Sequence, residues 1–147
     1  MKELKTAQDY VVISVRDSSV QTAERKLKIV IVGAEQRAWT SAEEGKARSF
    51  IRNLMEHQFP DALFISGDCP KGGVDQWVRE TATLLNKSFK SFPPQKRGWY
   101  WYKKRNMAMA KEGDMVIDLE PFGHVSGGTW TKDYALKIGK LGMTVEF

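Results

Sequence analysis

Apolar residues along this chain follow two kinds of pattern. The segments 62–66, 88–92, 115–119 and 143–147 are candidate strands, and residues 27–32 form a nearly continuous apolar run. Such runs are typical of strands buried on both faces, as in a parallel sheet. Between them, apolar residues recur at helical spacing in four segments: 41–59, one beginning near 74, 102–111, and one that follows 129. Strands alternating with helices through short connections predict an α/β protein with a doubly wound, mostly parallel sheet.

Individual residues mark where these helices begin and end. Thr40 or Ser41, followed by glutamates at 43 and 44, predicts the N-terminus of the first helix, and Pro60 ends it. Leu84 is expected on the apolar face of the second helix. Gly142 is expected to follow the end of the last helix, whose apolar face would extend to 141.

Length and composition predict one folded domain. Residues 1–26 form an N-terminal extension with a possible extra strand in the apolar patch at 10–15, and residues 27–147 form the domain. The chain has 147 residues, 41% hydrophobic and 28% charged, which are near globular averages and exclude a wholly disordered chain. Because no run of about 18 apolar residues exists, we expect no transmembrane helix and no membrane partner.

The cysteine and histidine content excludes several kinds of site. Cys69 cannot form an internal disulfide, and with His57 and His124 it gives no metal-ligand spacing. We therefore expect no metal and identify no cofactor, in a soluble protein of the reducing cytoplasm. The net charge of +5 permits an anionic ligand without identifying one.

The loops that follow the predicted strands have the composition of an anion site. In open parallel sheets, ligands bind at the carboxyl ends of the strands. The loop at 66–75 contains Ser66, Gly67, Lys71, Gly72 and Gly73 before a helix, where backbone N–H groups attract anions. The alternative is that these glycines only form a tight turn. A Walker A loop is excluded because Gly-Val stands where Lys-Ser/Thr is required, and no Gly-x-Gly-x-x-Gly follows the first strand.

Two further loops have similar features. Residues 126–129, Ser-Gly-Gly-Thr, precede the last helix, and Thr129 is suited either to cap that helix or to bind a phosphate. After the first strand, Arg37 is suited to grip a phosphate and Glu35 to accept ribose hydroxyls. Lone charges of this kind are more often simply solvated.

A stretch at 96–106 interleaves five cations with four aromatic residues. Cations follow a phosphate backbone and aromatic rings stack on bases, so this stretch is suited to bind a nucleotide or a single strand. The alternative is that the aromatic residues pack on the core while the cations face water. Cys69, beside a helix start, is interpreted as a partly buried, unreactive wall of the ligand pocket.

Taken in order, these motifs resemble a known family. They are the glycine after the first strand, Ser66-Gly67-x4-Gly72-Gly73-Val74-Asp75, Arg105-Asn106-x-x-Met109-Ala110, Asp114-Met115-Val116-Ile117, and Ser126-Gly127-Gly128-Thr129. The chain from about 28 onward resembles the DUF2493 proteins, related to YpsA, of the SLOG superfamily (the Smf/DprA–LOG group). This resemblance implies a three-layer Rossmann-like α/β/α domain, often dimeric, of bacterial or phage type, that binds nucleotide-derived ligands.

By matching motif position, the resemblance implies a phosphate or ribose site that includes the residues Gly33, Ser66, Gly67, Gly72, Asp75, Arg105, Asn106, Gly127, Gly128 and Thr129. The sequence departs from the family pattern in two loops. Residues 34–36 separate Gly33 from Arg37, and 68–71 are bulkier than usual. The LOG phosphoribohydrolases carry Gly-Gly-x-Gly-Thr-x-x-Glu, whereas this chain lacks the inner glycine and has Lys132 in place of the glutamate.

Three functions follow from these observations. The leading hypothesis is a nucleotide-binding module, possibly homodimeric, that acts as a sensor of a small anionic ligand. The second is a nucleoside-phosphate N-glycosidic hydrolase similar to LOG, with Glu35 or Asp75 as the acid/base group. The third is single-stranded DNA binding similar to DprA, ranked lowest because a charge of +5 is small for a dedicated nucleic-acid binder.

Overall fold

The computed structural model describes residues 26–147, so the strand predicted at 10–15 lies outside the described residues. Five strands form one sheet: β1 (Lys28–Gly33), β2 (Leu63–Ser66), β3 (Phe89–Ser91), β4 (Met115–Glu120) and β5 (Leu141–Glu146). Their order is β3-β2-β1-β4-β5, and every neighbouring pair is parallel. The predicted doubly wound sheet is confirmed, and within the described residues it is parallel throughout.

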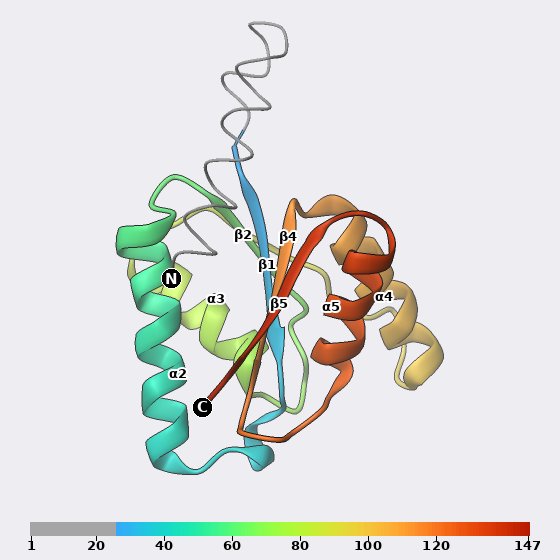
Figure 1. Cartoon of the computed structure of the whole chain (residues 1–147), viewed down its shortest axis with the longest axis horizontal. Helices are drawn as coiled ribbons and strands as arrows, with labels where there is room; N and C mark the ends of the chain where they lie inside the picture. Colours follow the sequence, from blue (N-terminus) through green and yellow to red (C-terminus); the bar gives the residue numbers. More distant parts are fainter. Residues whose placement is uncertain (1–25) are drawn as a thin grey trace, which may run out of the picture.

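Helices cover both faces of this sheet (Figure 1). α2 (Ser41–Asn53) and α3 (Val74–Leu84) lie on one face, and α4 (Trp99–Glu112) and α5 (Gly127–Lys137) lie on the other. Alternate residues of β1 explain the three layers: Ile29 and Ile31 join the core under α2 and α3, while Val30 and Val32 join the core under α4 and α5. An unbroken apolar run is therefore required, because each successive side chain enters a different core.

The strand order places a crevice at one edge of the sheet. From β1 the chain proceeds through α2 and α3 to β2 and β3, and then crosses through α4 to reach β4 on the other side of β1. The connections that leave β1 and β4 consequently turn to opposite faces. Neighbouring strands whose connections diverge in this way leave a crevice at their carboxyl ends.

The structure confirms the first helix start and corrects three details. Thr40 is the N-cap of α2, in a capping box with Glu43, and Leu54–Gln58 continues the helix as a π-helical turn, η3. α4 begins at Trp99, three residues before the predicted start, because Gly98 supplies the positive φ of 110° that precedes it. Leu84, the last residue of α3, is 74% exposed, whereas the next residue, Leu85, packs against the core.

The predicted end of the last helix is wrong. α5 ends at Lys137, and Gly139 at φ +84° turns the chain. The N–H of Gly139 donates to the Leu136 carbonyl, and that of Lys140 donates to the Ala135 carbonyl, which is the Schellman arrangement. Gly142 lies inside β5 instead. Helical spacing alone could not separate the two glycines, because the apolar residue at 141 extends the pattern by one turn.

Residues 26–147 lack both a membrane-spanning helix and a cluster of metal-binding side chains. Within this range no helix is both long and apolar enough to cross a bilayer. The same residues contain no group of three or more His, Cys, Asp or Glu side chains that could hold a metal ion.

Candidate functional site

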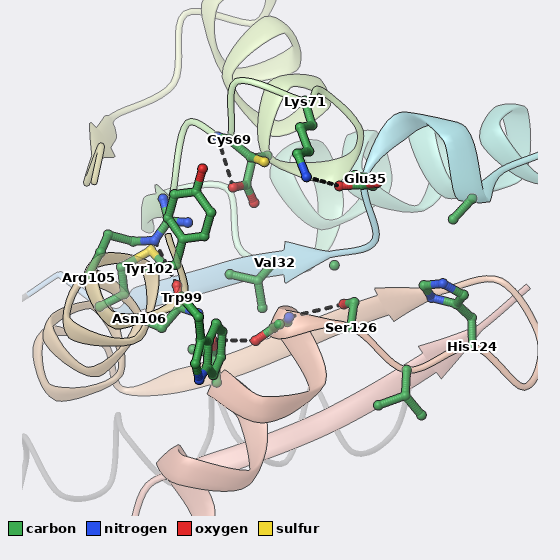
Figure 2. Close-up of a pocket in the computed structure, with 18 of the residues that line it drawn as sticks. Val32, Glu35, Cys69, Lys71, Trp99, Tyr102, Arg105, Asn106, His124 and Ser126 are labelled. Atoms are coloured by element: carbon green, nitrogen blue, oxygen red, sulfur yellow. Dashed lines mark hydrogen bonds and ion pairs between the residues drawn. The ribbon is translucent and has the colours of Figure 1, made fainter. Parts of the chain in front are cut away.

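A cleft of about 540 Å³ opens at the carboxyl ends of β1 and β4, at the crevice created by the strand order (Figure 2). Its walls come from four segments: the loop after β1, the β2–α3 loop, the N-terminal half of α4, and the approach to α5. Ten of the residues that the sequence singled out line this cleft: Gly33, Glu35, Arg37, Lys71, Asp75, Arg105, Asn106, Ser126, Gly127 and Gly128. Segments far apart in the chain thus supply one concave surface.

The other predicted residues do not line the cleft: Ser66, Gly67, Gly72, Gly73 and Thr129. Gly73 shows why its position needs glycine, because a Cβ there would lie 2.3 Å from the Ala34 carbonyl oxygen and φ is +84°. The N–H of Val74 donates to the same oxygen over 3.2 Å. These contacts bring the start of α3 against the loop after β1, so Gly73 fixes the position of two segments that form the cleft wall.

Asp75, in the first turn of α3, is a buried carboxylic acid at the cleft. The backbone N–H of Cys69 donates to its Oδ2 over 3.1 Å, and Ser66 Oγ lies 3.1 Å from Oδ1. Burial raises the pKa of Asp75, and the positive charge of Arg105 opposes this change. A carboxyl group that holds its proton more strongly than usual repels an anionic ligand less and is able to donate a hydrogen bond.

Cys69 lines the same part of the cleft. Burial raises the pKa of its thiol, and a hydrogen bond from the Lys71 backbone and the positive charge of Arg105 oppose this rise only in part. The thiolate is the nucleophilic form, and a raised pKa reduces its population at neutral pH. This side chain therefore has the properties of an unreactive wall residue.

Arg105 connects α4 to the ends of two strands. Its Nη1 donates to the carbonyl oxygens of Gly67 and Phe92, and its Nε donates to Asn106 Oδ1 over 2.7 Å. The guanidinium also lies 5.6 Å from the ring centroid of Tyr102. These contacts fix a permanent positive charge at the cleft wall and leave it little freedom to follow a ligand.

The opposite rim carries more exposed charges. Glu35 forms an ion pair with Arg37 and lies 3.8 Å from Lys71 Nζ (Figure 2). The side chain of Arg37 is 85% exposed, so water screens this pairing strongly. An anion that enters the cleft would compete with the carboxylate of Glu35 for the two cations.

The N-terminus of α5 forms the lower wall of the cleft. Ser126 caps this helix: its Oγ accepts from the N–H of Gly128 over 3.0 Å and donates to Glu120 Oε2 over 2.5 Å. Thr129 Oγ1 accepts from the N–H of Ser126 and donates to Asp118 Oδ2 over 2.8 Å. The hydroxyl of Thr129 is thus engaged within the cap, whereas Ser126 and Gly127 line the cleft.

Two acids at the end of β4, Asp118 and Glu120, were not identified by sequence reasoning. Both are fully buried beneath the start of α5, and Asp118 Oδ1 has no hydrogen-bond partner among the described residues. Burial, reinforced by the adjacent Glu120, raises the pKa of Asp118 to about 8. Alternating acids at the end of a buried strand were the available signal, because side chains two apart share one face.

Sequence reasoning also left His124 unassigned. Its Nδ1 lies 2.9 Å from Glu120 Oε1, and its half-exposed ring lines the cleft.

The four aromatic residues at 99–102 do not all face the same surface. Trp99 and Tyr102, three residues apart on α4, line the cleft beside Arg105, whereas Tyr100 and Trp101 do not (Figure 2). Helical spacing would have separated these pairs had the start of α4 been known.

The all-parallel sheet, its strand order and the cleft at the point of divergence define a Rossmann-like α/β protein. Among solved structures, the chain is similar to the molybdenum cofactor carrier protein MCP from Chlamydomonas reinhardtii, with a TM-score of 0.62 and 14% sequence identity. The match covers 82% of this chain and 76% of that chain. No protein-family model matches this sequence, and no curated protein matches it. At this identity, the similarity shows the fold.

Proposed function

We propose that the cleft binds a nucleotide or a nucleotide-derived ligand, such as a nucleoside monophosphate or ADP-ribose. The observation that carries this proposal is the meeting of one helix N-terminus, three cations and two aromatic side chains around a single cleft: α5, Arg37, Lys71, Arg105, Trp99 and Tyr102. Helix N-termini and cations favour phosphate, and aromatic faces favour a base. The volume of about 540 Å³ is that of an ordinary small-ligand site.

The positions of these groups define an orientation for the bound ligand. A phosphate fits between the start of α5 at Ser126 and Gly127 and the rim cations Arg37 and Lys71. The base then lies toward Trp99, which is 50% exposed and is braced edge-on by Trp130 at 5.5 Å. In this pose the buried carboxyl group of Asp75 faces the sugar.

Two similarities support a binding role. The sequence motifs resemble those of DUF2493 and YpsA-related SLOG proteins, and this resemblance supports a nucleotide-derived ligand, with residues 27–147 as the proposed binding domain. The structurally similar MCP is a molybdenum cofactor carrier protein, so at least one protein of this fold serves a small molecule. We infer that this chain acts as a binding module or sensor.

A thermal-shift panel tests the proposal. AMP, ADP, ADP-ribose and the molybdenum cofactor are added to the full chain, and the melting temperature is measured against concentration. A ligand at 100 times its Kd stabilises the folded state by about 2.7 kcal/mol, which for a domain of this size is a rise of roughly 5–10 °C. A flat response to every member of the panel would refute the proposal.

Variants locate the binding site. Trp99→Ala and Lys71→Gln are expected to reduce the ligand-induced rise, because they remove the base platform and a rim cation. Lys46→Gln is the matched control, since Lys46 is an exposed cation on α2, which covers the other face of the sheet. Equal loss of the response in all three variants would show that the effect does not come from a ligand bound in the cleft.

The raised pKa of Asp75 favours a second candidate function, N-glycosidic hydrolysis of a nucleoside phosphate. A general acid must hold a proton near neutral pH, as this carboxyl does more readily than an ordinary aspartic acid. Lys132, at the position of the LOG glutamate, lies 2.8 Å from Asp133 and supplies no acid. Turnover would be established by release of free base from AMP, measured by chromatography. This release is expected to be lost in Asp75→Asn or in Glu35→Gln. No release by the unmodified protein would eliminate this function.

A further inference from the structure

The positive charge of this protein is concentrated in one segment. Residues 81–111 contain no aspartate or glutamate and carry eight lysines and arginines. Because the whole chain has a net charge of +5, the remaining residues carry −3. The modest total therefore conceals a strongly basic segment, and a clustered charge of this kind is the electrostatic signature of a polyanion partner.

The structure places part of this charge where carboxylates do not neutralise it. Among residues 26–147, no carboxylate lies within ion-pair distance of Lys96, Arg97, Lys103 or Lys104. Lys90, by contrast, lies 3.6 Å from Glu112. The four unpaired cations surround the first half of α4 and the loop that precedes it.

Aromatic rings take the place of carboxylates beside these lysines. Lys104 Nζ lies 5.2 Å from the ring centroid of Tyr100 and 5.7 Å from that of Trp101, and Lys96 Nζ lies 5.2 Å from Trp101. The two rings meet edge-on at 5.1 Å, and Tyr100 is 60% exposed. We call Lys96, Tyr100, Trp101 and Lys104 the α4 patch.

A second cavity, of about 250 Å³, adjoins this patch. Its lining includes Trp101, Lys104 and Arg105 with Phe92 and Pro93, and it contains no acidic residue, unlike the main cleft. Arg105 stands between the two cavities and lines both. The volume is below the usual range of about 300–1,000 Å³ for whole small ligands, so the cavity is suited to one base of a longer molecule.

We propose that the α4 patch and this cavity bind single-stranded nucleic acid, separately from the ligand in the main cleft. Bases would stack on Tyr100 and Trp101, and phosphates would replace the aromatic rings as partners of Lys96 and Lys104. A single strand fits this surface better than a duplex does, because the aromatic rings need unstacked bases with free faces. An acidic polypeptide would satisfy the cations and would leave the rings unused.

Fluorescence anisotropy with labelled oligothymidylate of about 12 nucleotides tests the proposal on the full chain. Binding is expected to weaken with salt. A plot of the logarithm of the binding constant against that of the salt concentration has a slope of about −3 if Lys96, Arg97, Lys103 and Lys104 all contact phosphates. Tyr100→Ala and Trp101→Ala are each expected to raise Kd roughly 5- to 150-fold, the effect of losing one stacked base. Lys46→Gln, which removes an exposed cation of α2, is expected to leave Kd unchanged.

Other outcomes would overturn the proposal. These are absence of binding at low salt, equal affinity for a duplex of the same sequence, or equal affinity for polyglutamate of matched length. Because Tyr100 is mostly exposed, its alanine variant is expected to retain the melting temperature of the unmodified protein. If it does not, Tyr100→Phe and Tyr100→Leu supply the comparison: the aromatic variant must bind more tightly than the aliphatic one.

Discussion

Two adjacent glycines at the start of α5 differ in the space available for a side chain. A Cβ on Gly128 would lie 2.7 Å from Asp118 Oδ1 and from both Cα and N of Gly33, so this helix rests directly on the end of β1. A Cβ on Gly127 would meet nothing closer than 3.7 Å, at Trp99. The close approach at Gly128 sets the distance between α5 and β1, and hence the width of the cleft.

This difference makes a paired prediction. Gly128→Ala is expected to destabilise the protein by about 1–3 kcal/mol, because backbone and a buried carboxyl must move. Gly127→Ala is expected to be neutral or stabilising by up to about 1 kcal/mol, since alanine is the better helix former. Urea unfolding of both variants measures the difference, and equal free energies of unfolding would contradict the geometry.

Asp118 gives a second prediction, concerning pH. Its pKa is about 8 in the folded protein against an ordinary value of 3.8. Between these values the folded chain holds a proton that the unfolded chain has lost, so this group makes the fold less stable as pH rises through the window. Asp118→Asn cannot lose a proton, and its stability relative to the unmodified protein is expected to increase from pH 4 to pH 8.

Melting temperatures measured across that range test the Asp118 prediction. Asp133→Asn, which removes a largely exposed carboxylate, is the matched control. A difference between Asp118→Asn and the unmodified protein that does not change with pH would show that the Asp118 proton is not linked to folding.

Elements begin and end here through local contacts that can be tested in isolation. Thr40 Oγ1 accepts from the N–H of Glu43 over 3.2 Å, and the Glu43 carboxylate accepts from the N–H of Thr40 over 2.9 Å. Thr40→Ala is expected to cost about 1 kcal/mol of stability in urea unfolding. Ser41→Ala, one residue later and outside the capping box, is expected to change stability by less than about 0.5 kcal/mol. Equal losses would show that the capping box is not the source of the effect.

At the scale of the molecule, α4 separates two surfaces. Neighbouring residues on a helix point in different directions, so Trp99 lines the main cleft while Tyr100 belongs to the α4 patch. The main cleft is the proposed nucleotide site, and the α4 patch is the proposed site for single-stranded nucleic acid. The separation predicts that the two binding activities can be removed independently.

Measuring both binding activities in each variant tests this separation. Trp99→Ala is expected to reduce the nucleotide-induced rise in melting temperature and to leave oligothymidylate affinity within about twofold, a change of less than 0.5 kcal/mol. Tyr100→Ala is expected to do the reverse. Loss of both activities in either variant would indicate one shared site, and the two proposals would then merge into a single nucleic-acid cleft.

The sequence by itself determined the class of fold and most of the cleft. Apolar runs and helical period-3.6 spacing are local patterns, so the strands and helices could be predicted, and parallel strands necessarily gather their carboxyl-end loops at one edge. The residues Gly33, Arg37, Lys71, Arg105 and Gly127 followed from that rule and from the family resemblance. Boundaries set by backbone conformation, such as Gly139 rather than Gly142, did not follow, because apolar spacing fits either position.

Tertiary structure alone decided which of these residues reach the cleft and what stands behind them. Asp118 and Glu120 are buried acids because α5 closes over the end of β4, a contact between segments that no local pattern encodes. The same packing assigned Thr129 to the cap, brought His124 to the cleft, and divided the aromatic residues of α4 between two surfaces. Side-chain direction depends on where a helix begins and on which layer covers it, and both are properties of the assembled fold.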